Sequence, residues 1–409
     1  MKVAYLAPEL PALSATFVYN EILQLELIGT EVVSFSVHTS TSNIQEPRVK
    51  ALASKTFNLY AQSKLSVVKD NFVMLAVHPI RYMKTLGILS VDMWKVGLFS
   101  RTAFGLGYRM MYAASLARSL IKNKCEHLHV HFAHIPTDIA MYASSLSQVP
   151  YSVTAHANDI YERGWLLKEK VERSAFFATI SEFNIRYLTS KTSHSNKLRI
   201  IRCGVDPDKF EPRRDFVANE VIKVGMVGRL VEKKGIDTLI NALALLKKQG
   251  QRIELQIAGS GPLEEDLLKL VTDKKLTMLD VNFLGVMPHT EVADFIKSLD
   301  VFVLPCKKDS NGDMDGIPVV LMEAMLSGVP VISTMISGIP ELVVDKETGL
   351  LVEPNDEIAL AEAISCITQD DNLREYLIEG AIAKVKHEFS LTGNTQALNK
   401  LFITAIDSN

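Results

Sequence analysis

The residues best suited to chemistry lie in one segment, GDMDGIPVVLMEAMLSGVP, at positions 312–330. Asp315 stands directly before a Gly-Ile-Pro turn that starts an apolar helix, and Glu323 follows about one and a half turns into that helix. The free backbone N–H groups of Gly316 and Ile317 can hold a phosphate or a sugar hydroxyl. A carboxylate among apolar neighbours needs a partner, which is either an Arg or Lys of the fold or the adjacent hydroxyls of a ribose.

Two other patterns raise the question of a metal ion. Asp313 and Asp315 form the D-x-D pattern with which some sugar-nucleotide enzymes hold Mn²⁺ or Mg²⁺, but in those enzymes it lies early in a single domain. Here it lies late in the chain, beside a helix N-terminus that can itself neutralise a phosphate. His129 and His131 share one face of an expected strand, yet no close carboxylate completes a metal-binding set with them. We therefore expect no metal site.

Three loops that follow expected strands carry candidates for binding an anion or a flat ring. Arg229 and Lys234 of GRLVEKKG could grip a diphosphate, because Arg offers a planar fork and Lys a point charge. Gly259 in AGSGPLEEDL allows a tight turn before a helix, although the dinucleotide fingerprint is incomplete there, which argues against a dehydrogenase. Gly285-Val286 permits a flat ring to approach the backbone. Solvated loops and ordinary turns are the alternative in each case.

The first half of the chain offers a histidine at a strand end. His156 in SVTAHANDIY follows a strand directly, where reactive groups of parallel sheets lie, and its imidazole could donate to a sugar hydroxyl or to developing charge. A packing or capping histidine is the alternative. Asn158 follows on the same loop, and Ser14 or Thr16 could cap the first helix.

Parallel sheets must position these candidates, because short β-branched strands alternate with helical periodicity throughout the chain. The strands are continuous apolar runs, as in sheets buried on both faces. The pattern stops at the polar segment 206–220 and then restarts, which predicts two doubly wound, Rossmann-like α/β domains with ligands in a cleft between them. The expected strands are 3–7, 32–37, 128–132, 151–155, 176–180 and 198–201, then 221–227, 253–258, 281–284, 301–304 and 330–333.

Composition agrees with two domains, since 409 residues are many for a single core. The first 205 residues carry 23 Lys and Arg against 14 Asp and Glu, and the remainder carries 21 against 33. The most basic stretch, 64–124, is either a set of solvated helix faces or a surface for anionic lipid or an anionic acceptor. Four widely spaced cysteines indicate free, buried thiols in a reducing compartment, and we expect neither a signal peptide nor a transmembrane helix.

Together these stretches resemble the family-4 retaining glycosyltransferases, which have the GT-B fold of two Rossmann-like domains facing a cleft. The resemblance covers nearly the whole chain and points to the branch that builds colanic acid and other bacterial exopolysaccharides on a lipid carrier. It implies an acceptor-binding domain at 1–205, a nucleotide-sugar donor-binding domain at 206–386, and a C-terminal helix at 387–409 that crosses back to the first domain. The stretches that carry the resemblance are HVHFAHIPTDIA, TAHANDIY, RCGVDPDKF, GRLVEKKG and GDMDGIPVVLMEAM.

The resemblance also implies roles for the residues that match the family's motifs. Arg229 and Lys234 would grip the donor diphosphate, and Glu323, the second acid of an E-x7-E motif, would hold the donor ribose. Asp315 takes the first acid position near the transferred sugar, where the family usually has Glu, so its reach is one methylene shorter. His156 would lie near the reacting sugar. The donor side would include Gly316, Ile317, Val319, Gly259, Gly285 and Val286, and the acceptor side Ser14, Thr16 and Asn158.

The implied reaction moves a sugar from a UDP- or GDP-linked donor to a hydroxyl of a lipid-linked glycan, with retention of the anomeric configuration. The family is usually read as using same-face attack, in which the leaving diphosphate accepts the acceptor proton, and this needs no metal or other cofactor. We expect a cytoplasmic enzyme at the inner face of the plasma membrane, in contact with anionic lipid and not with nucleic acid. The alternatives are a non-catalytic nucleotide-sugar scaffold or sensor, favoured by the aspartate at position 315, and a sugar-nucleotide epimerase.

Overall fold

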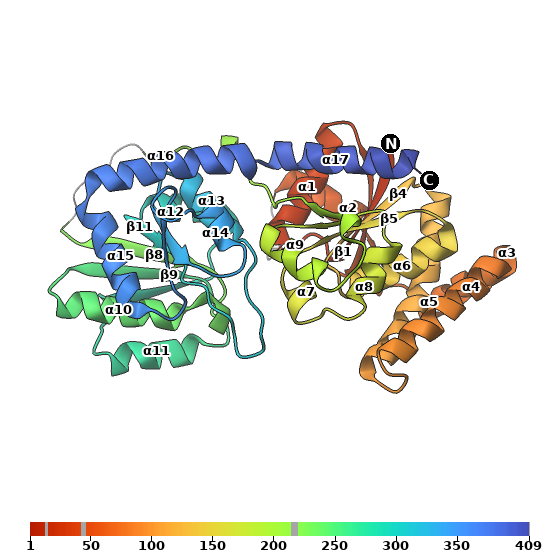
Figure 1. Ribbon diagram of the computed structural model, residues 1–409, viewed down its shortest axis with the longest axis horizontal. Coiled ribbons are helices and arrows are strands. Elements are labelled where there is room, and N and C mark those ends of the chain that lie inside the picture. Colours follow the sequence, from red (N-terminus) through yellow and green to blue (C-terminus); the bar gives the residue numbers. More distant parts are fainter. Residues whose placement is uncertain (13–14, 42–45, 214–219, 409) are drawn as a thin grey trace. The chain divides into compact units, whose positions relative to one another are not determined.

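The protein is described by a computed structural model that covers residues 1–12, 15–41, 46–213 and 220–408 (Figure 1). Contacts between Cα atoms divide the chain into an N-terminal unit, Met1–Arg202 with Leu391–Asn409, and a C-terminal unit, Cys203–Ser390. These divisions lie three and four residues from the boundaries expected at 205/206 and 386/387.

The N-terminal unit contains a seven-stranded, all-parallel sheet. Its order is that of a doubly wound fold, in which the chain moves outward to one edge and then returns to build the other. The reversal lies between the first and fourth strands. In spatial order the strands are β3 (Phe57–Asn58), β2 (Glu31–His38), β1 (Lys2–Glu9), β4 (His127–His131), β5 (Tyr151–Ala155), β6 (Phe177–Thr179) and β7 (Leu198–Ile200).

The C-terminal unit repeats this plan with a six-stranded parallel sheet. Its reversal lies between β8 and β11, which pair directly through Val301 and Val224. The structure therefore confirms the expected α/β class with two doubly wound parallel sheets. In spatial order the strands are β10 (Val281–Gly285), β9 (Ile253–Ala258), β8 (Ile222–Val227), β11 (Val301–Val303), β12 (Val331–Thr334) and β13 (Leu350–Val352).

All eleven expected strands are present, with ends that shift by at most two residues. Two edge strands, β3 and β13, were not expected. They are only two and three residues long, so they give no usable run of apolar residues in the sequence. All four cysteines are free, and Cys366 is exposed rather than buried.

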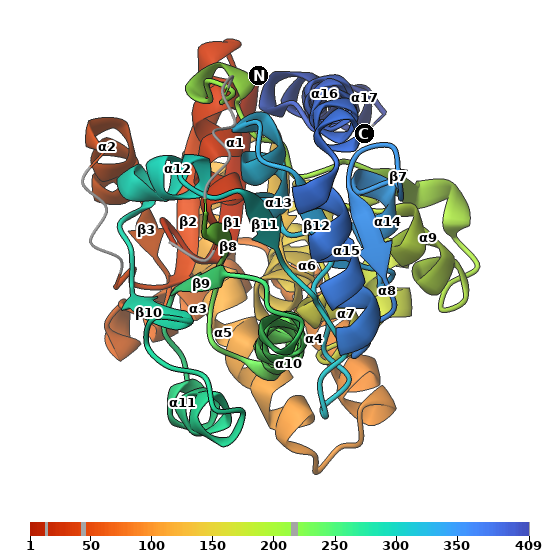
Figure 2. The same cartoon turned by 90° about the vertical axis from the view of Figure 1, so that its left-hand side faces the viewer.

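Helices cover both faces of each sheet, and Figure 2 shows the same elements from a second side. The N-terminal unit has α1 (Thr16–Leu27), α2 (Pro47–Lys55), α3 (Lys64–Val77), α4 (Pro79–Lys95), α5 (Arg101–Lys122), α6 (Ile135–Ser147), α7 (Asn158–Tyr161), α8 (Leu167–Arg173), α9 (Glu182–Thr189) and α17 (Leu391–Asp407). The C-terminal unit has α10 (Ile236–Lys248), α11 (Glu264–Asp273), α12 (His289–Lys297), α13 (Val319–Leu326), α14 (Ile339–Leu342), α15 (Glu357–Gln369) and α16 (Asp371–Glu388).

The last helix, α17, packs on the N-terminal unit. Phe402 is fully buried there and meets Tyr5 of β1 edge-on, with 6.3 Å between ring centroids. The Thr30 hydroxyl donates to the side-chain oxygen of Asn399 over 2.9 Å. The chain thus returns to its first unit after completing the second one.

Candidate functional site

The candidate site of the C-terminal unit lies where its strand order reverses. Ligands of doubly wound sheets bind outside the carboxyl ends of the strands at this point. Two loops leave β8 and β11 there, and the backbone N–H of Lys307 donates to the carbonyl of Lys233 between them over 2.9 Å. Gly235 has φ +67°, and a Cβ on it would lie 1.9 Å from the carbonyl oxygen of Pro305. Only glycine permits the two loops to pack this closely.

A cluster of opposite charges joins these loops. The Lys234 Nζ lies 2.7 Å from one carboxylate oxygen of Asp315, and the Lys233 Nζ lies 3.4 Å from the other. Lys233 also contacts Asp313 over 2.8 Å. The thiol of Cys306, fully buried, donates to Asp315 over 3.4 Å. Asp315 is therefore held by two ammonium groups and a thiol at once.

Electrostatics keep this cluster ionised. Burial alone would raise the pKa of Asp315, but Lys234 and Lys233 outweigh burial and hold that pKa below its ordinary value. Burial alone would lower the pKa of Lys234, but the Asp315 carboxylate raises it above its ordinary value. Arg229 acts against this rise, because its positive charge lies near Lys234. At neutral pH the loop presents three cations, Arg229, Lys233 and Lys234.

The sequence placed Lys234 and Asp315 in one site but did not predict that they pair. It also missed Lys233 and Cys306. The doublet Lys233-Lys234 in GRLVEKKG was a signal for a second cation, whereas nothing in the sequence relates Cys306 to Asp315. Arg229 is exposed on the same loop, as a ligand-binding guanidinium would have to be.

Helix α13 starts directly after this cluster. Gly316 and Ile317 are buried, and Val319 is the first helical residue. Among the described residues, no hydrogen bond occupies the backbone N–H groups of Gly316, Ile317 or Val319. Glu323 lies half-buried one turn further along the helix. These groups stand where the sequence predicted them, at a helix N-terminus that favours an anion.

The two glycines predicted on the donor side differ in their surroundings. Gly259 has φ +141°, and a Cβ on it would lie 1.9 Å from the carbonyl oxygen of Gly228, so packing between strand ends already requires glycine. Gly285 has φ +69° with open space above it, and the side chain of the following Val286 is 74% exposed. The backbone at Gly285 is thus open to a flat ring, whereas that at Gly259 is closed by the protein.

The carboxyl edge of the N-terminal unit carries a different set of groups, a buried network of imidazoles. The Tyr5 hydroxyl donates to Glu21 over 2.7 Å, and the same carboxylate oxygen lies 2.9 Å from Nε2 of His131. Nδ1 of His131 lies 3.3 Å from Nε2 of His156. The expectation that no close carboxylate accompanies His129 and His131 is wrong, because Glu21 reaches them from α1.

Among the residues that the structure describes, Glu21, His129 and His131 form a group that could hold a divalent cation, since their ligand atoms all lie within 4.8 Å of one another. Each of these residues already has a protein partner. The two nitrogens of His129 lie 2.8 Å from the Ser152 hydroxyl and 3.1 Å from the Thr154 hydroxyl. Burial lowers the pKa of His129, so its imidazole is neutral at physiological pH.

His156 lies at the end of β5 and is almost fully buried. Its ring packs between Phe17 and Phe132, with centroids 4.7 and 4.6 Å away. The Asp159 carboxylate accepts the backbone N–H of His156 over 3.0 Å and that of Ala133 over 2.6 Å, and thereby ties the loops after β5 and β4 together. Burial lowers the pKa of His156. The structure therefore presents a neutral imidazole that is fixed in orientation.

The residues expected on the acceptor side are less tightly grouped. Thr16 does not cap α1; the cap position is Ala15, whose side chain has no hydroxyl, so that expectation is wrong. Asn158 begins α7 and donates to Glu162. Ser14 lies outside the described residues.

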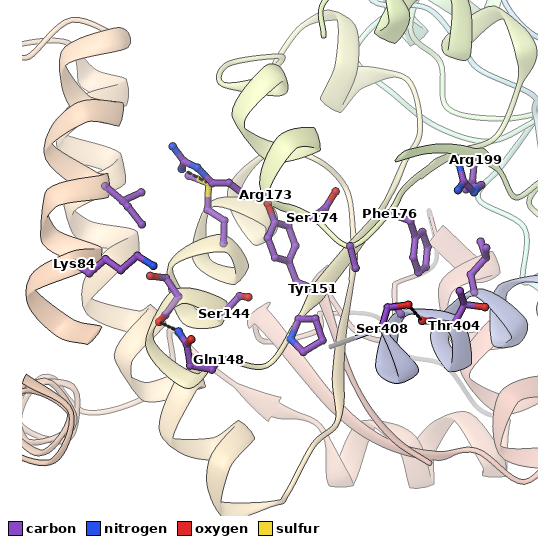
Figure 3. Close-up of a pocket in the computed structure, with 17 residues that line it drawn as sticks. Lys84, Ser144, Gln148, Tyr151, Arg173, Ser174, Phe176, Arg199, Thr404 and Ser408 are labelled. Atoms are coloured by element: carbon purple, nitrogen blue, oxygen red, sulfur yellow. Dashed lines mark hydrogen bonds between the residues drawn. The ribbon is translucent and has the colours of Figure 1, made fainter. Parts of the chain in front are cut away.

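One cavity of about 560 Å³ lies in the N-terminal unit, at the amino ends of its strands (Figure 3). Tyr151 and Phe176 line it at the amino ends of β5 and β6, and Thr404 and Ser408 close it from α17. Parallel sheets bind ligands at the carboxyl ends of their strands, where His156 lies, so this cavity is separate from His156 and its neighbours.

Comparison with known proteins agrees with this arrangement. The family described as "Glycosyl transferases group 1" matches residues 208–384, which include the whole charged cluster. The putative colanic acid biosynthesis glycosyltransferase WcaL of Salmonella typhimurium is 30% identical over 98% of both chains. The amylovoran biosynthesis glycosyltransferase AmsK of Erwinia amylovora is 28% identical over 95% of this chain and 96% of its own.

The fold is also that of a solved structure, Alr3699/HepE of Anabaena in complex with UDP and glucose. The TM-score is 0.72 over 99% of this chain and 100% of the other, at 15% identity. A likeness at this identity concerns the fold, here GT-B. The match to WcaL over nearly the full length of both proteins decides the family. The chain belongs to the group 1 glycosyl transferases.

Proposed function

We propose that the protein transfers a sugar from a UDP- or GDP-linked donor to a hydroxyl of a lipid-linked glycan in exopolysaccharide biosynthesis, with retention of configuration and without a metal ion. The observation that carries this proposal is the cluster of Lys233, Lys234 and Asp315 beside the N-terminus of α13. Cations and unoccupied backbone N–H groups at a strand-order reversal suit a diphosphate. The names of the relatives WcaL and AmsK support the exopolysaccharide product.

In the proposed reaction the acceptor oxygen forms a bond to the anomeric carbon as the bond from that carbon to the diphosphate oxygen breaks. The leaving nucleoside diphosphate takes up the acceptor proton on the same face of the sugar. Negative charge grows on the diphosphate as its bond to the anomeric carbon breaks, before the proton arrives. Arg229, Lys234 and the start of α13 would stabilise it, in the way that preorganised donors lower the barrier of other transfer reactions.

Lys233 would keep Asp315 neutralised while Lys234 binds the donor. A bound diphosphate would compete with Asp315 for Lys234, and two anions sharing one cation would repel each other. Because Lys233 already contacts the other oxygen of Asp315, that carboxylate keeps a cation when Lys234 turns towards phosphate. Asp315 would then remain ionised and able to accept a hydrogen bond from a sugar hydroxyl.

The N-terminal unit would receive the acceptor. The imidazole of His156, neutral and fixed by Phe17, Phe132 and Asp159, suits a hydrogen bond to an uncharged hydroxyl better than a contact with phosphate. The excess of basic residues in this unit suits an acceptor that carries a lipid diphosphate at the cytoplasmic face of the membrane.

The test is a transfer assay with a panel of UDP- and GDP-linked hexoses and a lipid fraction from an exopolysaccharide-producing cell, with and without EDTA. The proposal predicts glycolipid product from one donor, at a rate that EDTA leaves unchanged, with the donor's anomeric configuration by NMR. Loss of product in EDTA would contradict the metal-free mechanism. Donor binding without transfer to any acceptor would favour a scaffold, and conversion of the donor sugar without an acceptor would favour an epimerase.

A further inference from the structure

The N-terminal unit exposes an unusual amount of apolar surface on three helices. Among the described residues, 27 large apolar side chains are exposed, and 14 of them lie between Leu65 and Met111. This segment consists of α3, α4 and the start of α5, which extend away from the sheet as a helical arm (Figure 1). Apolar patches of this kind mark interaction surfaces, whereas scattered apolar side chains do not.

The exposed apolar residues follow helical spacing. On α4 they are Ile80, Met83, Val91 and Trp94, which share one face of the helix, and the exposed fractions of Ile80 and Trp94 are 84% and 71%. The loop from α4 to α5 adds Phe99, which is 90% exposed. A second face with the same spacing on α3 consists of Leu65, Val68, Phe72 and Leu75, and a third on α5 of Phe104, Tyr108 and Met111.

The buried residues of α4 are Leu89, which joins the core of the N-terminal unit, and two polar residues, Thr85 and Asp92. Thr85 is fully buried and its hydroxyl lies 2.7 Å from that of Ser145. Asp92 is fully buried and accepts two bonds from Arg173, over 2.6 and 2.7 Å. Hydrogen bonds and an ion pair therefore hold α4 to the protein. The apolar face of α4 that carries Ile80, Met83, Val91 and Trp94 stays exposed.

The charge on the arm has one sign. Its two acids, Asp70 and Asp92, are neutralised by Arg118 and Arg173. The remaining exposed charges are positive, and within the described residues no ion pair engages Lys64, Lys69, Lys84 or Arg101. An apolar surface set among unpaired cations matches the headgroup region of an anionic bilayer.

We propose that the apolar faces of α3 and α4 and the loop at Phe99 insert into the interface of an anionic phospholipid bilayer, with the four cations against the headgroups. No single described helix is long and apolar enough to cross a membrane, and α3 and α4, which pass that test only together, bend by 116° where they meet. A second copy of the chain fits less well, because a symmetric contact would bring the same cations face to face. The inference rests on the proposed function only in that a lipid-linked acceptor requires such a surface.

The experiment measures binding of the full chain to vesicles of phosphatidylcholine with and without phosphatidylglycerol. The variant Ile80→Gln/Trp94→Gln removes two exposed apolar side chains and keeps helix-forming residues; its binding should fall at least about tenfold. The variant Lys69→Gln/Lys84→Gln should lose roughly fivefold for each cation, on anionic vesicles only. The control Met278→Gln/Leu279→Gln removes equally exposed apolar residues of the C-terminal unit and should bind like the unchanged protein.

Trp94 gives a second readout that needs no destabilising change. Its emission should shift to the blue on anionic vesicles, and the shift should vanish in Trp94→Phe. An unshifted emission, or unchanged binding by Ile80→Gln/Trp94→Gln, would overturn the inference. A dimer in solution that this variant dissociates would overturn it in favour of self-association. UDP or GDP binding that persists in these cases would leave the proposed function standing.

Discussion

The two units of this protein share a strand order but differ in the chemistry at the edge where ligands bind. The C-terminal unit places ionised lysines and aspartates there, close to a helix N-terminus. The N-terminal unit places the imidazoles of His131 and His156 there, buried and hydrogen-bonded to each other and to Glu21, with His129 next to them bonded to hydroxyls. One strand order therefore carries ionised groups in one unit and buried imidazoles in the other.

The largest expected difference between the two units is the effect of acid on their stability. Burial lowers the pKa of His127 and of His134 to about 3, and lowers those of His129 and His156 as well. Each would be protonated near pH 6.5 in the unfolded chain but stays neutral in the folded one. The stability they contribute is present above pH 6.5 and is lost as the pH falls below it, at about 1.4 kcal/mol per pH unit for each histidine.

Urea unfolding followed by tryptophan fluorescence tests this, because both tryptophans, Trp94 and Trp165, belong to the N-terminal unit. The midpoint should fall steeply between about pH 6.5 and pH 5. The lowered pKa of Asp315 places its own loss of stability below pH 3.8, so nucleotide binding by the C-terminal unit should persist through this range. The variant His38→Gln, which changes an exposed histidine, is the control. A midpoint that does not move would refute the neutral network.

The next largest effect concerns the charged site. Lys234→Ala removes the cation nearest to Asp315, and turnover should fall by about 10²–10³, as when one preorganised donor is lost from other sites. Lys233 still neutralises Asp315 in this variant, so the unit should remain folded. Steady-state kinetics with the preferred donor would measure the change. Lys247→Ala, which breaks a more exposed pair with Asp280, should leave turnover unaltered; equal losses in both variants would remove Lys234 from the site.

A smaller effect on activity is expected from a change at the carboxyl ends of the strands of the N-terminal unit, where the buried imidazoles lie. Asp159→Ala leaves the buried N–H groups of Ala133 and His156 without an acceptor, at a cost of about 1–3 kcal/mol for each in the free energy of unfolding. Asp159→Asn keeps one acceptor oxygen and should recover part of the loss. The KM for the acceptor should rise while the Kd for the donor stays the same. A change in donor affinity instead would mean that the two edges are not separate in function.

The smallest effect distinguishes the two donor-side glycines. Gly285→Ala faces open space and should cost only about 1 kcal/mol of backbone strain, while a ring that stacks there would raise the KM for the nucleotide sugar. Gly259→Ala brings a methyl group against the Gly228 carbonyl and should destabilise the unit more, whatever the ligand. If Gly285→Ala leaves the KM unchanged, the backbone there does not receive the base.

The sequence predicted most strands of the two sheets, because these strands are continuous apolar runs. It did not predict the edge strands β3 and β13, because two or three residues are too few to form such a run. It predicted Asp315 and Lys234 individually, since each stands at a fixed offset from a strand or helix. Their pairing depends on two loops about 80 residues apart in the chain, which no local pattern relates. Glu21 escaped for the same reason, as it lies 110 residues from His131.

The helical arm shows a second feature that sequence periodicity does not predict. The spacing of Ile80, Met83, Val91 and Trp94 defines an apolar face, and such a face is ordinarily assigned to the core. Periodicity does not reveal which face meets the protein. Here Leu89 packs into the core and the polar partners Ser145 and Arg173 hold the same side of α4, so the apolar residues of the other side are exposed.

The proposed function requires that the C-terminal unit binds a nucleoside diphosphate through its lysines and a helix N-terminus, with no metal ion. Calorimetric titration with UDP and GDP, each with and without EDTA, tests it directly on the unchanged protein and on Lys234→Ala. We expect binding of one nucleotide with the same affinity in both buffers and a marked loss of affinity in the variant. Binding that disappears in EDTA would make Asp313 and Asp315 metal ligands and contradict a metal-free site.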